Sequence, residues 1–317
     1  MTLVLTADSA SELFTQACHA VLAAGHPAAP RGLPTIEVLG ASLTLTNPRR
    51  RLVDVPPARV INPAFAAAEA AWILSGSDDP WIYLYNERLA DYADHGRLMG
   101  AYGPRLRRWH GTVDQLAGVQ WQLTEDPGTR RAVIQLFDPE ADSGDHKDVP
   151  CTLGYRFFLR DGLLHMHTTM RSQDLWLGFC YDIFTATIVQ ELLASWIGAG
   201  LGRYWLCVDS LHLYARDLPK AQQLPRVTVP GPLMTPLAVP WKTFDELLNT
   251  VISGSPASGA GWAELAGVLA SYRARKAGDR EAARLIAASH GGPLAQALGR
   301  WYDRLDLNRQ VLKEAQR

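Results

Sequence analysis

Residues 149–214 hold the feature that most constrains how this chain can fold. Two apolar stretches, LGYRFFL and LLHMHTTM, flank the turn Arg160-Asp161-Gly162. Apolar stretches joined by an Asp-Gly turn predict a β-hairpin. An apolar helix over residues 182–197 and an aromatic-rich strand over 203–213 come next. At 317 residues the chain could form one large α/β domain or two ordinary ones.

The composition is that of an ordinary globular protein and excludes several classes. Hydrophobic residues make up 47% of the 317 residues, and the net charge of −1 gives no overall attraction to nucleic acid or membranes. The four cysteines form no CxxC pair, which favours reduced thiols over disulfides or a zinc site. No stretch has the roughly 18 apolar residues of a membrane span, and no signal peptide is evident. We therefore expect a soluble, cytoplasmic protein.

The remaining pattern predicts one large domain and a helical tail. Helices are expected at 9–25, 63–75, 82–93 and 112–125, and strands at 34–46, broken at Gly40, and at 132–137. Further helical segments are expected near 242–252, 262–276 and 279–289. We expect residues 1–240 to form the main domain and residues 241–317 a helical extension packed on it. No GxGxxG motif opens a βαβ unit, which counts against a Rossmann domain.

Several charged residues have both a structural and a functional interpretation. Glu69 lies in the middle of the apolar helix 63–75, where a glutamate is costly to bury unless it is paired, so it faces solvent, a partner or a site. Arg31, beside Gly32, is either a solvated loop charge or a phosphate clamp. Asp182 has a simple interpretation as a helix N-cap. The loop 139–148 is polar and is expected to be exposed.

Metal binding is not expected. His165 and His167 lie two residues apart on one face of a strand, but no third ligand accompanies them. A polar strand face explains both histidines. We therefore predict a site without a metal ion.

A set of residues at matched spacing resembles the thymidylate synthase superfamily. These residues are Cys151, Arg171, Ser172, Asp174, Gly178, His212 and Tyr214. Supporting matches are AEAAWILSG around Glu69, GAYGPRLR around Tyr102 and the tandem Arg130-Arg131. The resemblance runs from about Arg31 to Asp217. It implies an α+β fold, a twisted mixed sheet packed against helices with the sheet at the interface of a homodimer. It also makes residues 1–240 the catalytic domain.

The resemblance also implies a role for each residue. Cys151 would add to C6 of a pyrimidine, with its thiolate favoured by nearby arginines. Glu69 would organise water and proton transfer, and Tyr102 would assist removal of the C5 proton. The 5′-phosphate would be bound by Arg31, Arg171 and Ser172, and by Arg130 and Arg131 of the second subunit. The sugar would be bound by His212 and Tyr214. The co-substrate 5,10-methylenetetrahydrofolate would be held by Asp174, Trp72 and Gly178.

One departure from the family pattern, at Asp182, indicates the substrate. Thymidylate synthases carry Asn there, and an amide matches the N3–H donor and O4 acceptor of uracil. An ionised Asp accepts from the amino group of cytosine and can face a protonated N3. Opposite uracil, it would leave O4 facing a second acceptor, at a cost on the order of a few kcal/mol. Asp182 therefore resembles the cytidylate hydroxymethylase branch.

The resulting prediction is a folate-dependent (deoxy)cytidylate 5-hydroxymethyltransferase, acting on CMP or dCMP. The Ala-, Arg- and Leu-rich composition favours CMP and an antibiotic nucleoside pathway. Two alternatives stay open: a thymidylate synthase that methylates dUMP, and a non-catalytic nucleotide- or RNA-binding paralogue. The family's C-terminal lid over folate has no recognisable counterpart in this sequence.

Overall fold

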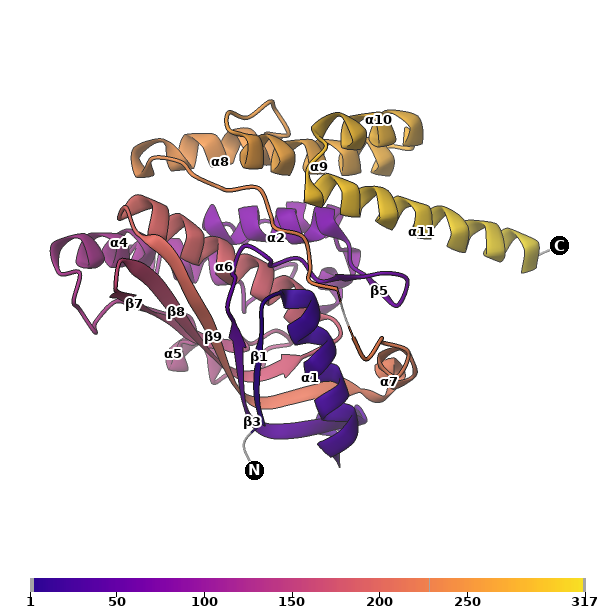
Figure 1. Cartoon of the computed structure of the whole chain (residues 1–317), viewed down its shortest axis with the longest axis horizontal. Helices are drawn as coiled ribbons and strands as arrows, with labels where there is room; N and C mark the ends of the chain where they lie inside the picture. Colours follow the sequence, from indigo (N-terminus) through magenta and orange to yellow (C-terminus); the bar gives the residue numbers. More distant parts are fainter. Residues whose placement is uncertain (1–2, 228, 316–317) are drawn as a thin grey trace.

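The computed structural model describes residues 3–227 and 229–315 and is built on a mixed seven-stranded sheet. The strand order is β1-β3-β9-β8-β7-β6, and β2 pairs with β3. The strands are β1 (Leu3–Ala7), β2 (His26–Ala28), β3 (Thr35–Leu45), β6 (Val133–Gln135), β7 (Thr152–Arg160), β8 (Leu163–Asp174) and β9 (Gly200–Tyr214). Two short strands, β4 (Asp54–Val55) and β5 (Arg59–Val60), form a separate pair. The sheet packs against helices, which confirms the predicted fold class (Figure 1).

The predicted hairpin is the β7–β8 pair. Its turn has positive φ at Asp161 (51°) and Gly162 (72°), the conformation that an Asp-Gly turn suits. The chain then crosses through helix α6 (Gly178–Trp196) and returns as β9, which runs parallel to β8. Parallel neighbours need such a crossover, so the apolar helix is buried against the sheet. This arrangement brings the ends of β8 and β9 together.

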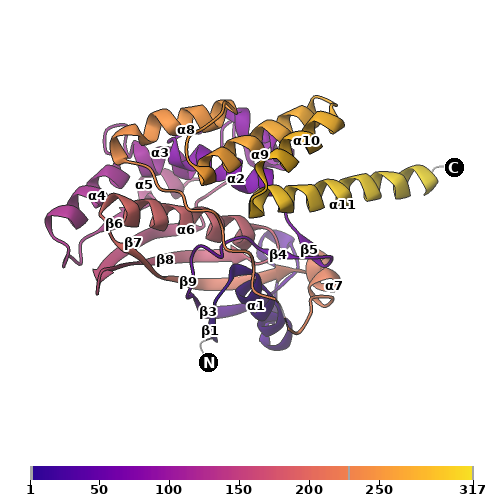
Figure 2. The ribbon, with the colours of Figure 1, turned by 45° about the horizontal axis from the view of Figure 1, so that its top comes forward.

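Helices form layers on one face of the sheet. Both α6 and α1 (Ala10–Ala24) pack on the strands, and α2 (Pro63–Leu74) lies over α6 (Figures 1 and 2). The remaining helices before β7 are short: α3 (Tyr102–Arg107), α4 (Gln115–Glu125) and α5 (Pro139–Asp142). Pro63 opens α2 as predicted, after the N-cap Asn62. The layers bury every residue of α2 except Glu69, which stays partly accessible.

Three local predictions differ from the structure. Strand β3 runs continuously through Gly40. Gly40 has a φ of 71°, which a glycine adopts at little cost, so the strand does not break there. Residues 82–93 form two 3₁₀ turns, η2 (Pro80–Leu84) and η3 (Glu87–Tyr92), because the extended backbone at Asn86 interrupts them. Helix α6 begins at Gly178, four residues before the predicted start, since the apolar residues before Asp182 are compatible with a helix.

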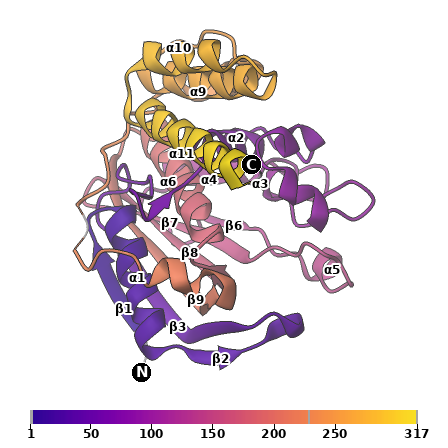
Figure 3. The same cartoon turned by 90° about the vertical axis from the view of Figure 1, so that its right-hand side faces the viewer.

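The C-terminal helices form an outer layer. They are α8 (Phe244–Ser253), α9 (Ala260–Lys276), α10 (Arg280–His290) and α11 (Pro293–Ala315), of which α11 has no counterpart in the prediction. The short α7 (Leu218–Ala221) instead contacts α1. Both α8 and α9 contact α2, and Trp241 packs edge-on against Trp196 with ring centroids 4.6 Å apart. Figure 3 shows this layer beyond α2. Treating residues 241–317 as a distinct extension remains a prediction.

None of the helices in the described ranges is long and apolar enough to cross a bilayer.

Candidate functional site

Two adjoining cavities meet at Cys151, at the start of β7. One has a volume of about 470 Å³ and is lined by Arg31, Lys147, Arg171, His212 and Tyr214 among others; we call it the cationic cavity. The other has a volume of about 280 Å³ and is lined by Glu69, Trp72, Tyr102, Tyr155 and Asp182 among others; we call it the carboxylate cavity. Four residues line both: Tyr92, Asp148, Val149 and Cys151. The shared residues make them two ends of one site.

The cationic cavity is built at the ends of β8 and β9. The parallel register pairs Ser172 with Ser210, and Asp174 with His212. Ser172, His212 and Tyr214 line the cavity, together with Arg31 from the turn before β3. The fold therefore brings together the residues that the sequence predicts for phosphate and sugar.

Arg171 ties this cavity to the cysteine. Its Nε donates to the carbonyl of Pro150 (2.9 Å) and its Nη2 to the carbonyl of Val149 (2.8 Å). Its backbone N–H donates to the carbonyl of Cys151 (2.9 Å). Arg171 thus fixes the segment that carries the thiol and also lines the cavity. A guanidinium held in this way is pre-oriented for an anion.

The carboxylate cavity brings a phenol next to the cysteine. Tyr102 lies at the start of α3, and its hydroxyl accepts a hydrogen bond from the backbone N–H of Thr152 (3.1 Å). Burial raises the pKa of Tyr102 well above its usual value, and the neighbouring Asp182 and Cys151 add to the shift. The phenol is therefore neutral at physiological pH.

Asp182 is held inside the second turn of α6, so its interpretation as an N-cap is wrong. Its Oδ2 accepts a hydrogen bond from Nε2 of Gln173 (2.8 Å). A Cβ at Gly178 would lie 2.9 Å from that Nε2 and 3.2 Å from Oδ2, so a glycine leaves room for the pair. Burial raises the pKa of Asp182 to about 6, and the hydrogen bond from Gln173 opposes the shift.

Glu69 faces the same cavity from α2. Its Oε2 is buried without a hydrogen-bond partner among the described residues. Burial, and then the nearby Asp182, raise its pKa well above the usual value. The raised pKa favours the protonated form of Glu69.

The thiol of Cys151 differs from expectation. Arg171 and Arg31 do lower its pKa, as predicted, but burial outweighs them and raises the pKa to about 11, with Asp182 and Asp148 contributing. In this state the thiol is protonated, because desolvation of a thiolate costs more than two arginines recover. Attack by Cys151 thus requires that its proton leave as the substrate binds.

Some predicted residues lie elsewhere. Asp174 and Gly178 line neither cavity; Oδ1 of Asp174 instead accepts from the backbone N–H groups of Trp176 (2.8 Å) and Leu177 (3.2 Å), which holds the turn into α6. Arg130 and Arg131 are exposed before β6 and also line neither cavity. Trp72 does line the carboxylate cavity, and its Nε1 donates to the carbonyl of Asp79 (2.9 Å).

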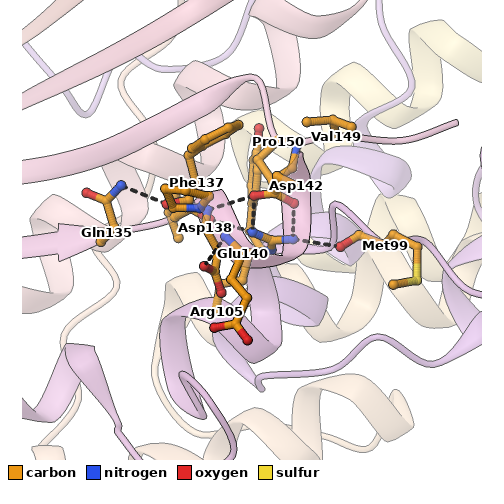
Figure 4. A network of polar contacts seen from close by, with 12 residues as sticks. Met99, Arg105, Gln135, Phe137, Asp138, Glu140, Asp142, Val149 and Pro150 are labelled. Atoms are coloured by element: carbon orange, nitrogen blue, oxygen red, sulfur yellow. Dashed lines mark hydrogen bonds and ion pairs between the residues drawn. The ribbon is translucent and has the colours of Figure 1, made fainter. Parts of the chain in front are cut away.

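The loop before Cys151 is more ordered than its polar sequence predicts. Asp142 is buried and accepts two hydrogen bonds from Arg105, both of 2.6 Å (Figure 4). Arg105 also donates to the carbonyls of Leu136 and Met99 (2.8 Å each). This network anchors the chain just before the segment that contains Asp148 and Cys151. The expectation of an exposed loop is therefore wrong at Asp142.

Sequence reasoning missed Asp148 and Gln173. Asp148 lies three residues before the cysteine and lines both cavities. Gln173 lies between Ser172 and Asp174, so its neighbours pointed to the site, but its own side chain carried no signal. Only the α6 crossover brings Gln173 to Asp182.

Comparison with known proteins gives a consistent family. The family model for "Thymidylate synthase" matches residues 12–247 of this chain. A deoxyuridylate hydroxymethyltransferase of Bacillus phage SP01 is 35% identical over 221 residues, which cover 65% of this chain and 57% of that protein. A protein of the same name from Pseudomonas phage M6 is 34% identical over 171 residues, 52% of this chain and 48% of its own. A thymidylate synthase of Symbiobacterium thermophilum is 30% identical over 184 residues, which cover 52% of this chain and 64% of that protein. The matches thus span about half to two thirds of these relatives.

Proposed function

Because this chain belongs to the thymidylate synthase family, we propose that it transfers a one-carbon unit from methylenetetrahydrofolate to C5 of a pyrimidine nucleoside monophosphate. The product we propose is the 5-hydroxymethyl nucleotide. Two relatives named as deoxyuridylate hydroxymethyltransferases support hydroxymethylation. The carboxylate of Asp182 supports cytosine as the base. The single observation that carries the choice of base is the buried Asp182 in a cavity that also contains Cys151.

The carboxylate cavity has the chemistry to hold a pterin. Trp72, Leu89 and Tyr92 provide flat or apolar walls, while three carboxylates (Glu69, Asp148 and Asp182) line the same space. Aromatic walls suit the faces of a planar heterocycle, and carboxylates suit its N–H edges. Methylenetetrahydrofolate, when bound, supplies the one-carbon unit. We infer that Trp72 contacts the pterin; Asp174 and Gly178, which lie outside the cavity, stay predictions.

The residues of the chain account for the remaining steps. Arg31, Arg171 and Ser172 bind the 5′-phosphate, and His212 and Tyr214 bind the sugar. The sulfur of Cys151 adds to C6 of the base, which makes C5 nucleophilic. Tyr102, beside the cysteine, assists removal of the C5 proton, and Glu69 supplies a proton. Water adds to the exocyclic methylene carbon on C5, and the Cys151–C6 bond then breaks.

Asp182 supports cytosine because of the groups that each base presents. Cytosine offers an amino donor and an N3 that can take a proton, so an ionised carboxylate can pair with both positions. Uracil offers N3–H and O4, and O4 cannot supply a proton. An ionised Asp182 would therefore leave O4 facing an acceptor. The hydrogen bond from Gln173 holds the carboxylate in one orientation and favours its ionised form.

The second candidate is a uridylate substrate. The names of the two phage relatives favour it. Because the pKa of Asp182 is about 6, a neutral form is within reach. A neutral carboxyl offers one donor and one acceptor, which match O4 and N3–H of uracil. The distinction between the two bases then depends on the proton on Asp182.

A substrate panel tests the proposal. CMP, dCMP, UMP and dUMP are each incubated with the protein and methylenetetrahydrofolate, and the nucleotides are analysed by mass. We expect a hydroxymethyl product and tetrahydrofolate, with cytidylates preferred. A methyl product with dihydrofolate would instead indicate thymidylate synthase chemistry. Absence of any product, with nucleotide binding retained, would favour a non-catalytic binding protein.

The variant Asp182→Asn sharpens the test of base choice. We expect cytidylate turnover to fall about 100-fold and uridylate binding to improve, because an amide matches uracil. Kinetics on the same panel measure both changes. An unchanged preference in Asp182→Asn would mean that selectivity lies elsewhere.

We also propose a homodimer in which Arg130 and Arg131 reach the partner's phosphate. One face of the sheet packs on α1 and α6, while Leu39 and Val133 on the strands are 68% and 44% exposed. Exposed apolar side chains on strands favour burial against another molecule. Both arginines are exposed and outside their own subunit's cavities. Sedimentation velocity of wild type and of a Leu39→Glu variant tests the dimer, which the variant should dissociate.

A further inference from the structure

Asp148 is a half-buried carboxylate to which the proposed steps assign no proton transfer. It lines both cavities, as does Cys151, so it lies where the two ends of the site meet. Its side chain rests against Gly100: a Cβ there would lie 2.8 Å from Oδ2 of Asp148. The absence of a side chain at Gly100 thus allows the carboxylate to occupy this position.

The cations near Asp148 are occupied by other partners. Arg105 is held by Asp142, and Arg171 donates to the carbonyls of Val149 and Pro150. Within the described ranges, no Arg, Lys or His nitrogen lies within ion-pair distance of the Asp148 carboxylate. The backbone N–H of Gly100 interacts with it. The carboxylate therefore retains the capacity to accept a hydrogen bond from a small molecule in the cavities.

The other acidic groups of the site are less suited to take a proton from water. Burial raises the pKa values of Glu69 and Tyr102 well above their usual ones, and both residues are assigned to proton transfers in the proposed steps. Asp182 is paired with Gln173 and is assigned to the base. Burial also raises the pKa of Asp148, but the N–H of Gly100 and the charges of Arg105 and Arg171 oppose the rise. A carboxylate whose pKa is raised is a stronger general base than an unperturbed one.

We propose that Asp148 binds the water molecule that hydroxymethylation requires and takes its proton. This inference rests on the proposed function. The water oxygen forms a bond to the exocyclic methylene carbon, and its proton passes to the Asp148 carboxylate. The electron pair of the exocyclic double bond moves into the ring, C5=C6 re-forms, and the Cys151 sulfur leaves C6 as a thiolate. No oxidant or reductant is consumed.

The variant Asp148→Asn tests this role, because it keeps the shape of the side chain and removes the base. We expect hydroxymethyl nucleotide formation to fall about 100-fold or more. Release of tritium from C5 in a single turnover should persist, because that proton leaves before water adds. The trapped methylene adduct should react with added 2-mercaptoethanol to give a thioether nucleotide. Asp145→Asn, an exposed carboxylate in the same loop, is the matched control and should behave as wild type.

A second variant separates chemistry from folding. In Asp148→Ala, added formate should restore part of the hydroxymethyl product by acting as the missing base, whereas acetamide, which is not a base, should not. A damaged fold would respond to neither compound.

The outcomes that overturn the inference are distinct from those that overturn the proposed function. If the wild-type protein forms the hydroxymethyl nucleotide and Asp148→Asn forms it at a rate within threefold of wild type, Asp148 is not the base. The same holds if tritium release falls in step with product, or if formate has no effect on an Asp148→Ala variant that still releases tritium from C5. If wild type yields only a methylated nucleotide, the proposed hydroxymethylation fails first, and the role of Asp148 fails with it.

Discussion

The two cavities that meet at Cys151 differ in the sign of their charged side chains and in how far these side chains are buried. The cationic cavity places Arg31, Arg171 and Ser172 at strand ends, where Arg31 stays exposed. The carboxylate cavity surrounds Glu69 and Asp182 with apolar helices, and burial raises the pKa of both. Solvated cations attract an anion without changing their own protonation. Buried carboxyls have an ionisation state that depends on what binds beside them.

This difference assigns binding to one end and chemistry to the other. Interactions at the phosphate are the same in the ground and transition states, so they affect KM more than kcat. Groups at the base end change protonation or form bonds during the reaction, so they affect kcat. Cys151 lies at the junction and belongs to the base end by its burial and raised pKa.

The largest expected effect is that of Cys151→Ala. Without the sulfur, C5 cannot become nucleophilic, so tritium release from C5 should fall at least about 10³-fold. Nucleotide binding, measured by calorimetry, should change little because the phosphate end is intact. The assignment of Cys151 to chemistry would be contradicted if the variant lost affinity in proportion to activity.

An intermediate effect is expected at the phosphate end. Arg31→Ala should raise the nucleotide KM about 10- to 100-fold with kcat nearly unchanged, since a charge-assisted hydrogen bond contributes about 1.5–3 kcal/mol. Turnover of the unphosphorylated nucleoside provides the control, because it cannot use this contact and should be equally slow in both proteins. If Arg31→Ala instead lowered kcat and left KM unchanged, Arg31 would act in the chemical steps, and the separation of binding from chemistry between the two cavities would be wrong.

The smallest expected effect is a pH dependence of base choice. With its pKa raised to about 6, Asp182 is neutral below that pH and ionised above it. The neutral form can pair with either base, whereas the ionised form lacks the donor that O4 of uracil needs. The ratio of kcat/KM for cytidylate to that for uridylate should therefore rise about three- to tenfold as pH increases through this value. A ratio that stays flat between about pH 5 and 8 would show that Asp182 does not titrate in the complex.

Much of the fold followed from local pattern. The Asp-Gly turn predicted the β7–β8 hairpin, and Ser9 and Pro63 marked the starts of α1 and α2 as observed. The ends of helices were harder to predict where a residue suits two positions in a helix equally well. Asp182 suits a cap as well as a helix interior, and only the packing of residues 178–181 against the core selects the interior.

The sequence alone determined the family, the fold class and several residues that line the two cavities, Cys151 among them, because a nucleophile and its neighbours are recognisable by type and spacing. Their protonation was decided by the tertiary structure. Arginines beside a cysteine predict a lowered pKa, yet burial by helices far apart in sequence raises the pKa of Cys151 to about 11. The placement of Asp148 against Gly100 likewise arises only when distant segments pack together. The pairing of Gln173 with Asp182 depends on how the chain turns from β8 into α6. The cost of desolvating a group depends on all the atoms that surround it in the folded protein, so it cannot be inferred from the neighbouring sequence.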